Sequence, residues 1–263
     1  MDPLLAAALA ALDITDEPRP LTAHHTDAWR AGRWKIKTTV EPKAAVLLLH
    51  EARAVRLLHA RSLHPADGRH GRVGEGVWTA VEFLPGADLW QWCARGRVPD
   101  PPPDFAPRLT TIAHRAFAAL DDLHAAGWRH GDLQPWNILI GPGDQPVFVD
   151  HEYTHHAGLL PPVAPYRDGM DHATTPGVAR RLLHTSPEVH IRLTPADERH
   201  ALAAALRWAW TGTTPATTRD VGPDVTLDDL LEDIATGRHH VPLADARPWP
   251  APELEALIAH ATT

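Results

Sequence analysis

Proline and glycine interrupt this sequence so often that only short helices and strands fit between them. The chain of 263 residues contains 26 prolines and 17 glycines. Proline lacks a backbone donor and glycine favours turns, so both residues mark where elements end. No apolar run reaches the roughly 20 residues that a membrane-spanning helix needs. We therefore expect a globular chain whose elements are short and have recognisable ends.

The charge balance argues against a nucleic acid as partner. There are 33 acidic and 25 basic residues, which gives a formal net charge of -8, and no basic block offsets the acids. The single cysteine, Cys93, cannot form an intrachain disulfide. The first apolar run, residues 4–12, follows Asp2 instead of a basic segment and is unlike a signal peptide. These features predict a cytoplasmic protein that engages neither nucleic acid nor membrane.

Hydrophobic periodicity predicts a small β-containing first part and a mostly helical second part. The four prolines of segment 99–104 are typical of a linker between the two parts. The patterns predict strands over 34–40 and 77–84, and helices over 42–60, 109–126, 194–210, 227–235 and 252–261.

Two short apolar runs around the turn sequence 141–146 predict a β-hairpin. Residues that face each other in an antiparallel pair have a constant sum of residue numbers. If Ile140 faces Val147, then Asn137 faces Asp150 at the open end of the hairpin. The hairpin register therefore predicts that these two polar side chains converge.

The polar residues near that open end indicate a metal-assisted site. Asp132 precedes the hairpin, and carboxylate and amide oxygens are the ligands that Mg²⁺ prefers when it is shared with phosphates. His130 and His151 stand beside these acids and make zinc the competing interpretation. Their spacing matches no common zinc pattern, so we favour magnesium.

Lysine is rare in this chain and clusters near the first strand. Only Lys35, Lys37 and Lys43 are lysines, against 22 arginines. Lysine is a compact point charge suited to a phosphate, for which the planar arginine side chain is a poor substitute. The competing interpretation makes Lys35 and Lys37 ordinary solvent-facing residues of an edge strand.

The segment 130–137, with the sequence His-Gly-Asp-Leu-Gln-Pro-Trp-Asn, resembles the catalytic loop of the protein-kinase-like superfamily. Five further features occur in the order of that family, and such a series is hard to obtain by chance. They are Lys37 and Glu51 as the strand lysine and helix glutamate, Glu82-Phe83-Leu84 as the hinge, Asp150-His151-Glu152 in place of Asp-Phe-Gly, Ser186-Pro187-Glu188 in place of Ala-Pro-Glu, and Asp197 on the helix that carries a buried aspartate.

The resemblance implies an α+β, bilobal, protein-kinase-like fold. A small, reduced, β-rich N-lobe is expected over residues 1–86, with residues 1–20 as a helical or irregular extension. A mostly α-helical C-lobe is expected over residues 87–263.

The resemblance also implies a phosphotransferase that uses ATP and Mg²⁺. Asp132 would orient the attacking hydroxyl and accept its proton. Asn137 and Asp150 would hold Mg²⁺ on the phosphates of the nucleotide.

In the first lobe, Lys37 would bind the α- and β-phosphates, and Glu51 would hold Lys37. The Glu82 carbonyl and the Leu84 amide would meet adenine. The interval of 14 residues to Glu51 favours Lys37 over Lys35 as the phosphate ligand, although the pattern alone leaves both registers open.

Several positions depart from the protein-kinase pattern and leave the acceptor open. Gly131 stands where regulated protein kinases have arginine, so we expect no activation by phosphorylation. Gln134 and Glu152 also differ, and this active site is similar to those of aminoglycoside and choline phosphotransferases. The segment 186–188 and the helix after it look instead like a protein kinase. The acceptor is therefore a Ser/Thr hydroxyl of a peptide or protein, or the hydroxyl of a small metabolite.

The first 36 residues contain a single glycine, Gly32, so no glycine-rich phosphate loop can form. Such a loss is common in catalytically inactive pseudokinases, and a pseudokinase that acts as a binding scaffold or partner-activating subunit is the alternative function. It also leaves room for a protein partner that completes the N-lobe. Because the catalytic residues are all present, we favour the active enzyme, and the arginine- and proline-rich composition suggests a bacterial source.

Overall fold

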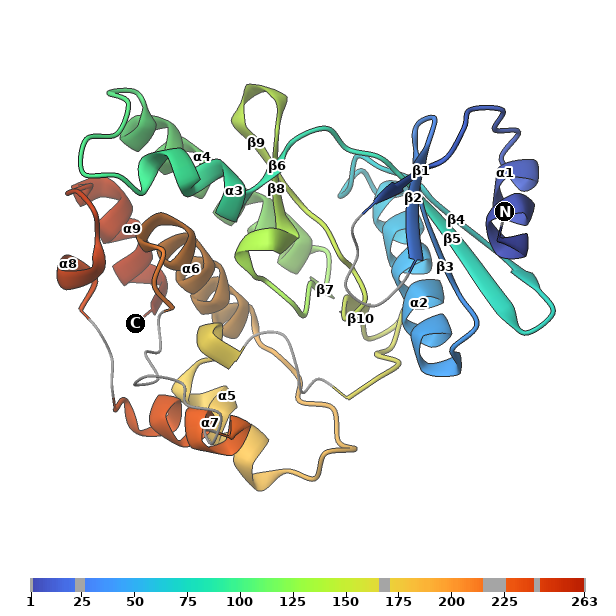
Figure 1. Ribbon diagram of the computed structural model, residues 1–263. Helices are drawn as coiled ribbons and strands as arrows, with labels where there is room; N and C mark the ends of the chain where they lie inside the picture. Colours follow the sequence, from blue (N-terminus) through green and yellow to red (C-terminus); the bar gives the residue numbers. More distant parts are fainter. Residues whose placement is uncertain (1, 22–26, 166–170, 215–225, 239–241, 263) are drawn as a thin grey trace. The chain divides into compact units, whose positions relative to one another are not determined.

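The protein has an α+β architecture in two compact units (Figure 1). The computed structural model describes residues 2–21, 27–165, 171–214, 226–238 and 242–262. The first unit comprises Met1–Pro85 and Asp150–Ala164, and the second comprises Gly86–Val149 and Pro165–Thr263. Among the described residues, no helix has the length and apolar character needed to cross a membrane.

An antiparallel sheet forms the centre of the first unit. Its five strands follow the order β1-β2-β3-β5-β4, so β3 is an interior strand and not an edge. Two helices and a short strand complete the unit. The elements are α1 (Pro3–Ala11), β1 (Arg19–Leu21), β2 (Asp27–Ala31), β3 (Trp34–Thr39), α2 (Pro42–His59), β4 (Gly68–Val73), β5 (Gly76–Glu82) and β10 (His155–His156).

The side chains of strand β3 point alternately to the two faces of the sheet. Trp34 and Ile36 are buried in a cluster with Leu5 and Ala8 of α1, while Lys37 points to the other side, where it meets α2. The two helices therefore contact opposite faces of the sheet (Figure 1). Asp2 fixes α1 at its start, because its side chain accepts hydrogen bonds from the Leu4 amide and the Thr38 hydroxyl.

Helix α2 begins where the sequence indicates, at Pro42. The Glu41 side chain caps it by accepting hydrogen bonds from the amides of Lys43 and Ala44. Its buried residues include Leu48, Glu51 and Val55 on the face toward the sheet. A carboxylate on an otherwise apolar buried face needs a partner, and Lys37 supplies it.

The segment after Asp150 belongs to the first unit because it is anchored to α2 and its neighbours. The Nε2 atom of His50, on α2, lies 2.6 Å from the Thr154 carbonyl oxygen. His151 Nδ1 lies 2.8 Å from the Thr154 hydroxyl, and its ring meets that of His64 edge to face at 5.1 Å. These contacts fix the backbone on which the candidate site residues 150 and 152 stand.

The second unit is mostly helical and has a small sheet of order β6-β8-β9. Its core includes large buried side chains such as Phe105, Leu120, Trp128 and Trp210. The proline-rich segment 99–104 lies inside this unit and does not separate the two units, which corrects the sequence-based expectation. The elements are β6 (Ala87–Asp88), α3 (Leu89–Cys93), η1 (Ala94–Gly96), α4 (Phe105–Ala125), β7 (Trp128–Arg129), η2 (Pro135–Asn137), β8 (Ile138–Gly141), η3 (Pro142–Asp144), β9 (Gln145–Phe148), η4 (Asp171–Ala173), α5 (Pro176–His184), α6 (Pro195–Thr211), α7 (Leu227–Thr236), α8 (Leu243–Ala246) and α9 (Pro252–Thr262).

The predicted hairpin exists, but its register differs by one residue from the predicted one. Ile140 faces Pro146, and the Val149 amide donates a hydrogen bond to the Asn137 carbonyl. The strands extend further into the turn than the apolar pattern suggests, because Gly143 and Asp144 both take positive φ and close a three-residue loop. Asn137 therefore pairs with Val149, and Asp150 is the next residue along the chain.

Helix α6 starts at Pro195, within one residue of the predicted start, but its buried acid is Glu198 and not Asp197. Asp197 and Thr194 form a capping box at the first turn. Glu198 is fully buried and accepts a hydrogen bond of 2.7 Å from the Gly131 amide. Its second oxygen lies 2.6 Å from His124 Nε2 of α4. One carboxylate thus ties α4 and the loop that contains Gly131 to α6.

We expect Glu198→Ala to destabilise the second unit by about 3 kcal/mol, because the buried Gly131 amide and His124 side chain lose their common partner. Glu198→Gln should stay within about 1 kcal/mol of the parent, since an amide oxygen can accept from Gly131 and the amide nitrogen can donate to a neutral His124. Urea unfolding followed by tryptophan fluorescence measures both. Equal stability of the alanine variant and the parent would contradict the role of Glu198.

Candidate active site

The residues singled out from the sequence fall into two groups, one in each unit. Lys37, Glu51 and Asp150 belong to the first unit, whereas Asp132 and Asn137 belong to the second.

Lys37 is buried in the first unit and paired with Glu51. Lys37 as a whole is 8% exposed, and its Nζ atom donates a hydrogen bond of 2.8 Å to Glu51 Oε2. Lys35, two positions earlier on the same strand, is exposed. Of the two lysines that the sequence left open, Lys37 is therefore the one that the fold holds inside.

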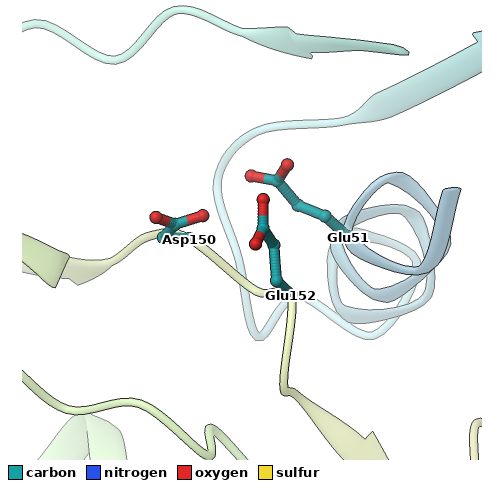
Figure 2. Close-up of side chains that lie close together, drawn as sticks. All are labelled: Glu51, Asp150 and Glu152. Carbon is teal, nitrogen blue, oxygen red and sulfur yellow. The ribbon is translucent and has the colours of Figure 1, made fainter. Parts of the chain in front are cut away.

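Two further carboxylates surround the same ammonium group. Glu152 Oε1 lies 3.4 Å and Asp150 Oδ1 lies 3.5 Å from Lys37 Nζ. Figure 2 shows that the three carboxylates point toward one another, Glu51 from α2 and the other two from the segment after β9. One oxygen from each lies within 4.8 Å of the others. Sequence reasoning noted Glu152 only as a departure from the family pattern and gave it no place in the site.

Burial and charge compete at this cluster. Burial would lower the pKa of Lys37, but the negative charges of Glu51, Asp150 and Glu152 outweigh it and raise the pKa above its ordinary value. For Glu152, burial and the charges of Asp150 and Glu51 outweigh the attraction of Lys37 and raise the pKa to about 7. One cation thus stands among three acids, and the carboxylates compete for it.

The oxygens of this cluster fit a hard divalent cation. Asp150 presents a side chain that is 44% exposed, and that of Glu152 is 27% exposed. Asp150 has a φ of +65°, a left-handed conformation that aspartate tolerates better than most residues, and it turns the chain directly after the hairpin. An all-oxygen set with excess negative charge suits Mg²⁺ better than zinc.

In the second unit, Asp132 is held by its own loop. Gln134 Nε2 donates to Asp132 Oδ1 at 2.6 Å, and Asn137 Nδ2 donates to Asp132 Oδ2 at 2.8 Å. Asn137 Nδ2 also meets the Asp132 carbonyl oxygen at 3.0 Å. Because both carboxylate oxygens accept hydrogen bonds, the acid is fixed in orientation, and Gln134 has a structural role in this loop.

Gly131 is required by the backbone of this loop. Its φ of +87° lies in the left-handed region that favours glycine, and its amide donates to Glu198. An arginine at this position would be strained. The backbone conformation of this loop therefore suits the glycine found here and not an arginine.

The predicted hinge residues follow strand β5. The Glu82 side chain accepts a hydrogen bond from the Asp67 amide at 3.0 Å, and the Phe83 amide donates to the Arg33 carbonyl at 2.6 Å. These bonds fix the end of the strand just before Leu84. The assignment of the Glu82 carbonyl and the Leu84 amide to adenine stays a prediction.

In the sequence, residues 22–26 connect β1 to β2. Residues 22–26, with the pair His24 and His25, lie outside the described part of the chain, as do His239 and His240. The two strands themselves pair antiparallel, with Leu21 opposite Ala28.

Comparison with known proteins gives a relationship at low identity. No protein-family model matches the sequence. Among similar proteins, serine/threonine-protein kinase pkn3 of Myxococcus xanthus is 35% identical over 102 residues, which cover 38% of this chain and 17% of the relative. Probable serine/threonine-protein kinase PkwA of Thermomonospora curvata is 26% identical over 193 residues, which cover 70% of this chain and 23% of the relative. The chain thus spans less than a quarter of the length of these relatives. The similarity relates it, at low identity, to bacterial serine/threonine protein kinases.

Proposed function

We propose that this protein is an ATP- and Mg²⁺-dependent phosphotransferase that transfers the γ-phosphoryl group to a hydroxyl. The observation that carries the proposal is the buried Lys37–Glu51 pair with Asp150 beside it. Lys37, held in place by Glu51, binds the α- and β-phosphates of the nucleotide, and Asp132 orients the acceptor hydroxyl and takes its proton.

Energetics supports a function for the lysine. Burying an ammonium costs several kcal/mol before pairing, and an apolar pair of similar volume is often as stable or more stable. The lysine side chain is 10% exposed, and its partner Glu51 is 7% exposed. A chain that only needed a stable sheet and helix would have no reason to place both charges there.

The metal and acceptor complete the proposed reaction. Asp150, with Asn137 as predicted from the sequence, would hold Mg²⁺, and the Glu152 oxygen offers a further ligand beside Asp150. When bound, Mg²⁺ neutralises charge on the phosphates. The acceptor is a peptide or protein Ser/Thr hydroxyl or a small metabolite. The loop geometry at Gly131 supports activity without phosphorylation, and a partner chain that completes the first unit is a further part of the proposal.

The decisive experiment measures thermal stabilisation by ATP with and without Mg²⁺. A ligand at 100 times its dissociation constant stabilises by about 2.7 kcal/mol. We expect a magnesium-dependent shift in the parent and in the control variant Asp16→Ala, and its loss in Asp150→Asn, which keeps a side chain that tolerates the φ of +65° at this position but removes the charge that would hold the metal. A parent protein without any magnesium-dependent shift would contradict the proposal. Binding without transfer to any hydroxyl would favour the scaffold alternative.

Asp132→Asn should retain Mg-ATP affinity but lose phosphoryl transfer by about a hundredfold or more, because an amide cannot accept the proton. In this variant the new amide nitrogen would also face a hydrogen-bond donor, either Gln134 or Asn137. A loss of transfer would then have two competing explanations, the mismatched hydrogen bond and the missing base. The double variant Asp132→Asn/Gln134→Glu restores donor–acceptor pairing and should remain inactive. Recovered transfer in the double variant, measured with radiolabelled ATP, would argue against Asp132 as the base.

Lys37→Met should weaken ATP binding by about tenfold or more while adenosine binding changes little, because only the phosphates lose a charged partner. Lys35→Met is the matched control and should affect the two ligands alike, since this side chain is exposed on the same strand. Calorimetric titration gives all four affinities. An ATP-selective loss in the Lys35 variant alone would shift the assignment of the strand by two residues.

A further inference from the structure

The three carboxylates around Lys37 occupy every donor of its ammonium group. An ammonium has three N–H donors, and Nζ donates to Glu51 at 2.8 Å, to Glu152 at 3.4 Å and to Asp150 at 3.5 Å. All four residues belong to the first unit, and Figure 2 shows the carboxylates pointing toward one another. A phosphate can therefore bind Lys37 only where a carboxylate gives up its hydrogen bond.

The three contacts of Lys37 differ in how readily they can be exchanged. In the short contact with Glu51 both side chains are buried, at 10% and 7% exposure, so breaking it would leave two desolvated charges. The contacts with Glu152 and Asp150 are longer, and these side chains are 27% and 44% exposed. The carboxylates that can release Lys37 are therefore the two on the segment after the hairpin.

Releasing Lys37 is unfavourable unless another cation takes its place. One oxygen from each of Glu51, Asp150 and Glu152 lies within 4.8 Å of the others, so the carboxylates repel one another once Lys37 turns away. A metal-free nucleotide would add further negative charge beside them. Carboxylate oxygens are ligands for a divalent cation, so Asp150 and Glu152 can exchange Lys37 for a metal ion.

We propose that Glu152 is a positioning residue that makes nucleotide binding depend on a divalent cation. In the free protein, Glu152 competes with phosphate for Lys37. In the complex, Glu152 pairs with the cation and leaves a donor of Lys37 to the phosphates. The inference rests on the proposed function, because it assigns the regulation of the same site. By linkage, the cation and the nucleotide then raise each other's affinity by the same factor.

A carboxylate that served only as a metal ligand would give a different result on substitution. Its removal would weaken the binding of Mg-ATP and would not strengthen the binding of ATP without metal. A carboxylate that competes for Lys37 suppresses the binding of metal-free ATP, so its removal strengthens that binding. A gain of affinity for metal-free ATP therefore distinguishes the two roles of Glu152.

Lysine side-chain NMR can read the contact directly, because the chain contains only three lysines. The full chain is labelled with ¹³C at the lysine ε position, and the exposed Lys43 serves as an internal reference. ATP and adenosine are titrated with EDTA or with Mg²⁺ at pH 8. At that pH Glu152, whose pKa is raised to about 7, is mostly ionised.

In the parent we expect Mg-ATP to move the Lys37 signal and metal-free ATP to bind at least about tenfold more weakly. In Glu152→Gln, metal-free ATP should move the Lys37 signal and bind about tenfold tighter than in the parent, while adenosine affinity stays the same. The matched control is Glu75→Gln, the same change at an exposed position between β4 and β5 of the same unit. It should behave like the parent.

The outcomes separate this inference from the proposed function. If the parent binds Mg-ATP at Lys37 but Glu152→Gln gains no affinity for metal-free ATP, the inference is overturned and the proposed function stands. If the parent does not bind Mg-ATP, both are overturned. Glu152→Ala repeats the test where the glutamine variant does not fold. The parent alone also decides, because metal-free ATP that binds as tightly as Mg-ATP overturns the inference.

Discussion

The first unit depends on keeping the Lys37 ammonium charged inside the protein. The strand supplies the lysine, α2 supplies Glu51 at 2.8 Å, and the segment after the hairpin supplies Asp150 and Glu152. Removing one partner of such a buried pair is more costly than never having built it, because the remaining charge stays desolvated. The Lys37 ammonium therefore couples three parts of the chain that are distant in sequence: β3, α2 and the segment with Asp150 and Glu152. It explains why residues 150–164 belong with the sheet and not with the helices that precede them.

The second unit uses one buried carboxylate in a comparable way. Glu198 holds the Gly131 amide and His124, so the loop of Asp132 is attached to two helices. Asp132 then receives hydrogen bonds on both oxygens from Gln134 and Asn137. If Asp132 acts as the base in the proposed reaction, this fixed orientation means that it loses little freedom when an acceptor binds, and such positioning raises the rate. Both units thus place their functional acids with buried polar contacts, which require complete pairing.

Periodicity predicted much of this fold, and local backbone geometry accounts for what it missed. Regular strands and helices account for the shared face of Trp34 and Ile36 and for the interval from Lys37 to Glu51. These features could therefore be predicted from the sequence. The hairpin register depended on Gly143 and Asp144 taking positive φ, which no hydrophobic pattern reports. The sequence-based assignment placed the buried acid of α6 at Asp197, but Asp197 belongs to the capping box and Glu198 makes the buried contacts. Thr194, three residues before Asp197, was the sequence signal for that capping box. Glu152 had only its unusual identity as a signal, since its approach to Lys37 depends on how the chain turns at Asp150.

The charges of the first unit also bear on the missing glycine-rich loop. Lys37 contributes one positive charge and its three neighbours contribute three negative charges when all are ionised, so the group is net negative toward an anionic nucleotide. Protonation of Glu152, whose pKa is raised to about 7, removes only one of those charges. Lysine alone therefore cannot attract the phosphates, and the sequence before Lys37 contains no glycine-rich motif. In the proposed function, the oxygens of Asp150 and Glu152 would face a divalent cation that accompanies the nucleotide. The excess of acid beside Lys37 is therefore consistent with phosphate binding. The carboxylates that repel a bare nucleotide would attract its complex with a divalent cation.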